Sequence, residues 1–282
     1  MASFDFSPPV IAHRGASGYA PENTMASFVK AAQLGIKWVE FDVVLAKCGT
    51  PIIFHDETLD RTSNAHGLID DYTYTQLQAF DAGKWFHPHF SSERIPTLAQ
   101  VLVFLYEAGM SANVEIKPMP GKEEETVENT LETFRELNRN GVYGAARAYS
   151  EPRPSGSGVI REATKTKRGN LPNDVPQILF SSFSVPSLRH LRRLAPDCSI
   201  GLLLEQWDHD WQSISDELKC VSINAHELII TQESAQKVKQ SGHYLLCYTV
   251  NNPMRAQELF AMGVDAVFSD YPDTIIKELV HG

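Results

Sequence analysis

Carboxylate, imidazole and cationic side chains recur at the ends of short apolar runs within the first 120 residues of the chain. Together they supply three carboxylates, two imidazoles and two cations, at Glu40, Asp42, Glu115, His13, His55, Arg14 and Lys117. Cleavage of a phosphate ester with the help of one hard metal ion needs a set of this composition. The residue types therefore indicate phosphoryl chemistry before any fold is considered.

Two of the carboxylates, Glu40 and Asp42, share one face of a predicted strand, because residues two apart on a strand point to the same side. Burying both charges is costly unless they are paired or hold a metal. If the strand of Glu115 is a neighbour, three negative charges converge, and repulsion would leave at least one protonated unless a cation lay among them. The all-oxygen donor set predicts Mg²⁺ or Ca²⁺ rather than zinc. A structural salt-bridge network with Arg14 and Lys117 is the alternative.

The overall composition is that of an ordinary globular protein with an excess of acidic residues. The 282 residues carry a formal net charge of −10, which argues against nucleic acid or an anionic membrane as the main partner. Residues 1–9 lack the features of a signal peptide and no later run is long enough to span a membrane. We therefore expect a cytoplasmic protein without stable membrane association. Four cysteines without a CxxC pair predict free thiols.

Strands that alternate with helices carry the candidate residues. Apolar, β-rich runs occur at residues 10–12, 38–45, 112–116, 177–180, 199–204, 220–223, 244–250 and 266–268. Helical patterns occur at residues 24–34, 97–108, 123–140, 185–195, 208–218, 231–241, 252–262 and 274–280. Eight strands alternating with eight helices predict an α/β fold, a (β/α)₈ TIM barrel, with a doubly wound open sheet as the alternative. Barrel active sites form at the carboxyl ends of strands, where most of the candidates fall.

Two stretches interrupt a chain that we interpret as one barrel domain over residues 1–282. After the second strand, a turn sends residues 52–54 back as a hairpin that carries His55 and Asp56. Asp56 either accepts a hydrogen bond from His55 or caps the turn. Residues 57–96 are too many for a plain connection, which predicts a small cap over the barrel mouth. The composition of residues 145–173, rich in turn-forming and polar residues, predicts a mobile loop.

A series of short motifs follows in order along the chain. They are His13-Arg14-Gly15, Pro21-Glu22-Asn23-Thr24, Glu40-Phe41-Asp42, His55-Asp56, Leu59-Asp60-Arg61-Thr62, Ile95-Pro96-Thr97-Leu98, Glu115-Ile116-Lys117, Ser182-Phe183, Thr249-Val250-Asn251 and Asp270-Tyr271-Pro272. In this order they resemble the glycerophosphodiester phosphodiesterases, in particular the cytosolic bacterial type. The resemblance implies a (β/α)₈ barrel and metal-dependent hydrolysis of glycerophosphodiesters to sn-glycerol 3-phosphate and an alcohol.

The resemblance also implies roles for individual residues. Glu40, Asp42 and Glu115 match the metal ligands of the family, and His13 and His55 match its acid and base. In the implied mechanism one histidine takes a proton from the glycerol 2-hydroxyl as it attacks phosphorus, and the other protonates the departing alcohol. Water then opens the cyclic phosphate. Imidazole suits both roles because it titrates near neutral pH, and which histidine is the acid stays open.

Substrate contacts complete the expected site. The resemblance implies that Arg14 and Lys117 contact the phosphate. Tyr248 stands where the family usually has tryptophan, and we expect Tyr248 and Phe183 to line the pocket rather than the core. The expected partner is a small glycerophosphodiester, and the sequence makes no prediction of oligomeric state. Alternative functions are the same cleavage of a lysophospholipid and a barrel that binds a phosphorylated ligand without turnover.

Overall fold

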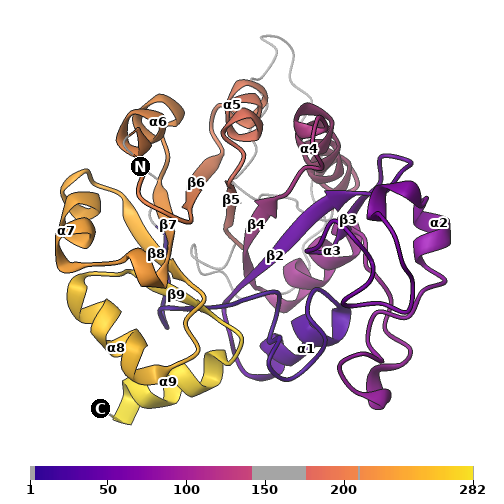
Figure 1. Ribbon diagram of the computed structural model, residues 1–282, viewed down its shortest axis with the longest axis horizontal. Helices are drawn as coiled ribbons and strands as arrows, with labels where there is room; N and C mark the ends of the chain where they lie inside the picture. The colour runs from indigo at the N-terminus through magenta and orange to yellow at the C-terminus, as the bar shows by residue number, and fades with distance from the viewer. Residues whose placement is uncertain (1–3, 142–175, 209, 282) are drawn as a thin grey trace, which may run out of the picture.

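Eight parallel strands form a closed ring in the computed structural model, which describes residues 4–141, 176–208 and 210–281 (Figure 1). The strands are β1 (Val10–Ala12), β2 (Trp38–Leu45), β4 (Ser111–Ile116), β5 (Ile178–Ser182), β6 (Ser199–Leu204), β7 (Ser222–His226), β8 (Tyr244–Tyr248) and β9 (Ala266–Ser269). They pair in the order β1, β9, β8, β7, β6, β5, β4 and β2, and β1 also pairs with β2. Because that last pairing closes the sheet, the predicted TIM barrel is confirmed and the open-sheet alternative is wrong.

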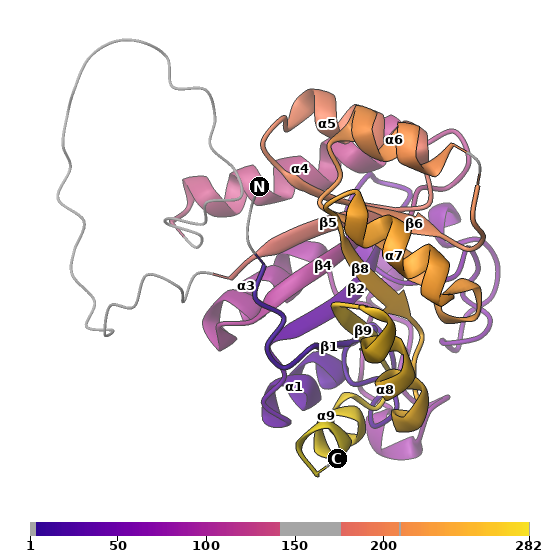
Figure 2. The ribbon, with the colours of Figure 1, turned by 90° about the vertical axis from the view of Figure 1, so that its left-hand side faces the viewer.

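Helices surround the strands, as Figures 1 and 2 show. They are α1 (Met25–Gln33), α3 (Leu98–Ala108), α4 (Glu123–Arg139), α5 (Val185–Leu194), α6 (Trp211–Leu218), α7 (Gln232–Gln240), α8 (Pro253–Met262) and α9 (Pro272–His281). Local signals set their ends: the side chain of Thr97 accepts a hydrogen bond from the first turn of α3, and Gly109 ends that helix at a φ of 67°. Because these signals are local, the predicted helix ranges agree with the observed helices. The largest difference is at the start of α6, which begins at Trp211 rather than at residue 208.

Aromatic side chains pack the amino-terminal end of the barrel interior. The rings of Phe4 and Phe6 lie with centroids 5.6 Å and 4.9 Å from that of Trp38, which begins β2. All three belong to a buried cluster that also contains Leu246 and Phe268. A second, larger cluster fills the space between the strands and the outer helices. The barrel therefore has a packed floor at the amino ends of its strands.

A layer of neutral polar side chains crosses the barrel interior between β4, β5 and β7. Asn113 donates a hydrogen bond to Ser181 at 2.8 Å, and Ser222 donates one to Asn224 at 2.8 Å, with all four side chains buried. A Cβ atom on Gly201 of β6 would lie 2.6 Å from the Ser222 hydroxyl, so glycine leaves the space that this layer needs. Asn113 precedes Glu115 by two residues, so the layer supports the strand that carries a candidate metal ligand.

The hairpin and the insertion lie beside β2. Strand β3 (Pro51–Ile53) pairs antiparallel with β2, as predicted. Residues 57–96 contain the short helices η1 (Ile69–Asp71), α2 (Tyr74–Leu77) and η2 (Pro88–Phe90). Leu59 and Leu77 of this segment belong, with Phe54, to a separate hydrophobic cluster. In Figure 1 the segment lies at the outer edge of the barrel, next to β3 and α3. That it acts as a cap stays a prediction.

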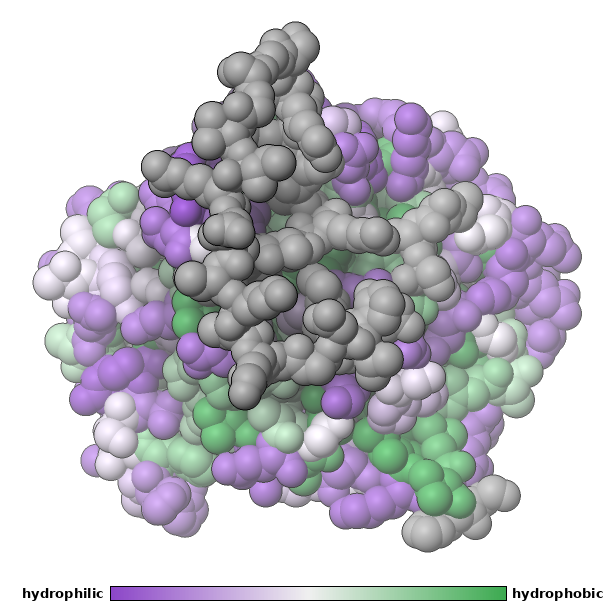
Figure 3. All heavy atoms as spheres, turned by 180° about the vertical axis from the view of Figure 1, so that it is seen from behind, coloured by the Kyte–Doolittle hydropathy of each residue, from purple (hydrophilic) through white to green (hydrophobic). Residues whose placement is uncertain are grey.

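The outer helices form much of the remaining described surface. From behind, Figure 3 shows mainly hydrophilic side chains along the outer edge of the molecule, as expected for helices that bury one side against strands. None of the described helices combines the length and the apolar composition needed to cross a bilayer. Cys48, Cys198, Cys220 and Cys247 are free thiols. The loop predicted at residues 145–173 lies outside the described residues.

Candidate active site

A pocket of about 490 Å³ lies at the carboxyl ends of the barrel strands. Its lining residues are His13, Arg14, Glu40, His55, Asn113, Glu115, Lys117, Phe183, Leu203, Glu205, His226, Tyr248, Thr249 and Phe268. The candidates from the sequence lie in this lining, except Asp42, which is 1% exposed in the strand below it. No residue of the insertion at 57–96 is part of the lining.

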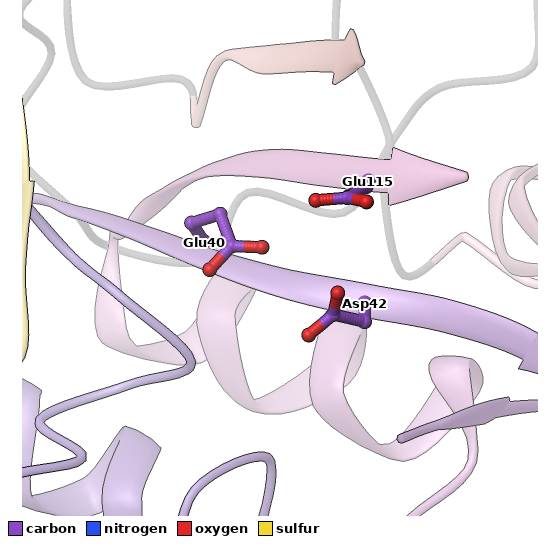
Figure 4. Close-up of side chains that lie close together, drawn as sticks. All are labelled: Glu40, Asp42 and Glu115. Atoms are coloured by element: carbon purple, nitrogen blue, oxygen red, sulfur yellow. The ribbon is translucent and has the colours of Figure 1, made fainter. Parts of the chain in front are cut away.

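Glu40, Asp42 and Glu115 bring their carboxylates together at one side of this pocket (Figure 4). Glu40 and Asp42 point to the same side of β2 because they are two residues apart, and Asp42 is directly opposite Glu115 in the β2–β4 register. One oxygen of each residue lies within 4.8 Å of the others. The sequence argument required neighbouring strands, and the barrel provides them.

The three carboxylates do not ionise alike. Burial, together with the charges of Asp42 and Glu115, raises the pKa of Glu40 well above its usual value. Burial and the charge of Asp42 raise the pKa of Glu115 to about 8. Burial would also raise the pKa of Asp42, but the charges of Arg14, His55 and Lys117 outweigh it and lower that pKa. Such a crowded all-oxygen group fits a hard divalent cation, which would relieve the repulsion.

Arg14 and Lys117 both lie beside Asp42. Nε of Arg14 is 3.5 Å from one oxygen of Asp42, and Nζ of Lys117 is 3.8 Å from the other. Buried Asn23 donates a hydrogen bond to Asp42 at 2.8 Å, and the backbone N–H of Arg14 donates one to Glu40 at 2.9 Å. The salt-bridge network that was the alternative thus exists, but two cations face three carboxylates. With all three carboxylates ionised, a net negative charge would remain for a metal ion to balance.

Each candidate histidine is oriented by its own carboxylate. Nδ1 of His13 lies 2.7 Å from Asp270, and Nδ1 of His55 lies 2.6 Å from Asp56. Because an ionised carboxylate only accepts hydrogen bonds, Nδ1 carries the proton and Nε2 is left to face the pocket chemistry. Burial, with the charges of Arg14 and Lys117, lowers the pKa of His55. Of the two roles considered for Asp56, the structure shows the hydrogen bond with His55.

The opposite side of the pocket is aromatic. The rings of Phe183 and Tyr248 meet edge to face with centroids 6.0 Å apart, and Phe183 is 47% exposed. The hydroxyl of Tyr248 donates a hydrogen bond to the carbonyl of Leu204 at 2.8 Å. His226 lies against Tyr248 with a centroid distance of 5.6 Å. Both predicted aromatic residues therefore lie in the lining, while their contact with substrate stays a prediction.

Sequence reasoning missed several residues that shape this site. His226 was missed because the predicted strand ended at residue 223, where polar Asn224 interrupts the apolar run, whereas β7 continues to His226. Glu22 and Arg61 were quoted within motifs but received no role. Asp270 was also quoted within a motif, and its partner His13 is 257 residues away in the chain. Only the closure of β9 against β1 reveals that pair.

The amino-acid sequence matches one protein family and related enzymes of known name over most of its length. The model of the glycerophosphoryl diester phosphodiesterase family matches residues 13–274. A glycerophosphodiester phosphodiesterase of Caldanaerobacter subterraneus is 31% identical over 272 residues, covering 95% of this chain and 96% of the relative. One of Bacillus subtilis is 30% identical over 284 residues, covering 95% of this chain and 85% of the relative.

A solved structure agrees with these sequence matches. It is a phosphodiesterase of Oleispira antarctica in complex with the product sn-glycerol-3-phosphate, 34% identical, with a TM-score of 0.81 over 97% of both chains. The predicted family and enzyme class, a phosphoric diester hydrolase, are thereby confirmed. From its sequence, its barrel and these relatives, the chain belongs to the glycerophosphoryl diester phosphodiesterase family.

Proposed function

We propose that this protein hydrolyses glycerophosphodiesters to sn-glycerol 3-phosphate and an alcohol, with one divalent metal ion and two histidines. The observation that carries the proposal is a group of three carboxylates, with one oxygen of each within 4.8 Å of the others, beside a pocket lined by two imidazoles. The product bound to the Oleispira antarctica relative supports the substrate class.

Glu40, Asp42 and Glu115 would hold the metal, Mg²⁺ or Ca²⁺. The donor set is all oxygen, and the raised pKa values of Glu40 and Glu115 indicate a site that lacks positive charge. When bound, the ion supplies polarisation of the phosphoryl oxygens and an anchor for the glycerol hydroxyls. Asn23 donates a hydrogen bond to one oxygen of Asp42, which restrains the orientation of that carboxylate.

His13 and His55 move the protons through Nε2, because Nδ1 of each is committed to Asp270 or Asp56. One Nε2 takes the proton of the glycerol 2-hydroxyl as that oxygen attacks phosphorus, and the other gives a proton to the leaving alcohol oxygen as its bond to phosphorus breaks. In the second step, the histidine that protonated the alcohol takes a proton from the water that attacks the cyclic phosphate. The histidine that took the 2-hydroxyl proton returns a proton to the 2-oxygen, so both imidazoles end in their starting protonation states.

Arg14 and Lys117 bind the phosphate oxygens in this proposal. Both are cations in the pocket lining beside Asp42, where they can contact an anion held by the carboxylate-bound metal. Phe183 and Tyr248 lie in the same lining and would contact the carbon atoms of the substrate.

The test is a coupled assay for release of sn-glycerol 3-phosphate from glycerophosphocholine, glycerophosphoethanolamine and glycerophosphoglycerol. Each substrate is measured with Mg²⁺, with Ca²⁺ and with EDTA. A lysophospholipid is included in the panel with release of its head-group alcohol as the readout, because the same cleavage leaves an acylated glycerol phosphate. We expect release from at least one soluble diester, with a metal requirement. Release from the lysophospholipid alone, or from no substrate with either metal present, would overturn the proposal.

A further inference from the structure

Arg61, in the insertion at 57–96, makes two bidentate ion pairs at the edge of the site. Its Nε and Nη2 donate to the two oxygens of Asp56 at 2.7 Å and 2.9 Å. Its Nη1 and Nη2 donate to the two oxygens of Glu22 at 2.8 Å each. A planar guanidinium holds both carboxylates in fixed directions, which lysine cannot do with a point charge.

Each of those carboxylates holds a residue of the proposed machinery. Asp56 accepts the Nδ1–H of His55 at 2.6 Å. Glu22 accepts a hydrogen bond from Nη1 of Arg14 at 2.7 Å. A continuous chain of contacts therefore runs from the proposed acid or base to the proposed phosphate contact, with Arg61 at its centre.

The two ends of that chain belong to separate parts of the barrel. His55 lies two residues after the end of β3, whereas Arg14 lies in the connection between β1 and α1. Arg14 has a φ of 53°, a left-handed conformation that costs free energy for a residue with a side chain and persists when surrounding contacts hold it. Through Asp56 and Glu22, Arg61 thus connects the loop that carries His55 with the loop that carries Arg14.

The insertion provides a firm base for Arg61. Leu59, two residues earlier, is fully buried in the cluster that also contains Phe54. The backbone N–H of Leu59 donates to Gly67 at 3.0 Å, and that of Ile69 donates to Glu57 at 2.9 Å, which closes the loop on itself. The guanidinium therefore starts from a packed loop, although its side chain is 46% exposed.

We propose that Arg61 is a positioning residue, which aligns His55 through Asp56 and Arg14 through Glu22 for phosphodiester cleavage. This inference rests on the proposed function, because it assigns the effect to the roles of His55 and Arg14. It also gives the insertion a task at the active site, although no residue of the insertion lines the pocket. The Arg61 side chain is 46% exposed, so water can solvate the two carboxylates when the guanidinium is removed, and the expected effect is on turnover more than on folding.

The test compares Arg61→Gln with Arg94→Gln. Arg94 lies in the same insertion, its side chain is 45% exposed, and it contacts the backbone of Glu93 and, at 3.9 Å, Asp81. With glycerophosphocholine and saturating Mg²⁺, we expect Arg61→Gln to lower kcat about tenfold to a hundredfold, because misplaced reacting groups cost rate steeply. Arg94→Gln should match the parent protein. The melting temperatures of the two variants should agree within about 3 °C.

Two further variants separate positioning from a general loss of structure. Arg61→Lys keeps the charge but loses the bidentate fork, so its kcat should lie between those of the parent and Arg61→Gln. In a His55→Ala background, adding Arg61→Gln should lower kcat little further, while KM still rises because Arg14 has lost its support. Fully additive losses of kcat would mean that Arg61 does not act through His55, and would overturn the proposal.

A measurement on the free protein keeps this test independent of activity. The side-chain ¹⁵N resonances of His55, assigned by their loss in His55→Ala, should move in Arg61→Gln and stay in place in Arg94→Gln. Those of His13, which pairs with Asp270 and not with Arg61, should stay in place in both. If the parent protein cleaves no diester, the proposed function fails, but the resonances still show whether Arg61 positions His55. Unmoved His55 resonances together with the parental kcat in Arg61→Gln would overturn the positioning role of Arg61.

Discussion

The two sides of the pocket differ in both chemistry and origin. The side formed by β1, β2, β4 and the hairpin carries charged groups, including Glu40, Glu115 and His55, drawn from the first 117 residues. The side formed by β5 to β8 carries Phe183, Leu203 and Tyr248. The hydroxyl of Tyr248 contacts a backbone carbonyl, and its ring contacts Phe183 and the imidazole of His226. The residues of the proposed proton and phosphate chemistry thus lie on one side. The other side, where Glu205 and His226 also line the pocket, can shape the space for the alcohol.

This difference extends to how each side is held. The charged side is tied together by ion pairs that pass from strand to strand, such as those of Asp42 with Arg14 and Lys117. The aromatic side is held by ring packing and by a hydrogen bond from Tyr248 to a carbonyl. Changes on the charged side should therefore alter turnover and metal binding, while changes on the aromatic side should alter substrate affinity.

Metal removal should give the largest effect. EDTA should abolish diesterase activity, and Mg²⁺ or Ca²⁺ should restore it, because the carboxylates of Glu40, Asp42 and Glu115 lack a balancing charge without it. Glu40→Gln should weaken the metal affinity by about tenfold or more, since even indirect partners of ligands contribute that much. The rise in melting temperature on metal addition reports this affinity. Glu205 is a carboxylate on the aromatic side, so Glu205→Gln should keep the parental rise in melting temperature on metal addition. An equal loss of metal affinity in Glu40→Gln and Glu205→Gln would contradict the assignment of metal binding to the charged side.

Loss of either histidine should come next. His13→Ala or His55→Ala should lower kcat by roughly 10²-fold, because a positioned acid or base contributes about that much. Metal-induced stabilisation should persist in both variants, since neither imidazole belongs to the carboxylate group. Steady-state kinetics and thermal shifts measured on the same samples would separate the two effects. Turnover at the parental rate by either variant would remove that histidine from the proton pathway.

The stability of the metal-free protein should depend on pH through the charged side. The pKa of Glu115 is raised to about 8 by burial and by Asp42, so the folded state holds this proton more tightly than the unfolded state does. Its stabilising contribution is complete below the unfolded value and is lost as pH rises through about 8. His55, whose pKa is lowered, opposes this fall only where the unfolded imidazole still titrates, up to about pH 7.5.

We therefore expect the melting temperature of the metal-free protein to fall between about pH 6.5 and 8.5. Added Mg²⁺ or Ca²⁺ should reduce the fall, because the cation replaces the proton. Glu115→Gln should also flatten the curve, as its amide does not titrate. A metal-free protein whose stability rises over this range would show that the carboxylates are balanced in another way.

The smallest effect is expected on the aromatic side. Phe183→Ala should raise KM about threefold to tenfold and change kcat little, since an aromatic contact contributes about 0.5–1.5 kcal/mol. The melting temperature should hardly change, because the side chain is 47% exposed. Leu228→Ala is the matched control, since Leu228 is 77% exposed and lies outside the pocket lining. A fall in kcat with an unchanged KM would place Phe183 with the charged side.

Local patterns in the sequence determined much of the barrel. Period-two spacing placed Glu40 and Asp42 on one face, and capping residues with terminal glycines marked helices such as α3 and α8 to within a residue or two. These features depend on neighbours a few positions apart, so they can be read without a fold. The same reasoning ended β7 too early. Asn224 is buried because it hydrogen-bonds to Asn113 on another strand, and no pattern in the neighbouring sequence indicates that partner.

Tertiary structure decided which of these residues meet. Ring closure sets β9 against β1 and brings Asp270 to His13, 257 positions away. The packing of the insertion against the hairpin places Arg61 between Asp56 and Glu22, which lies 39 positions earlier in the chain. The sequence by itself determined the chemistry available at the strand ends, because residue type and spacing are local. The partners of each histidine depended on barrel closure and loop packing, since those join segments that no local pattern relates.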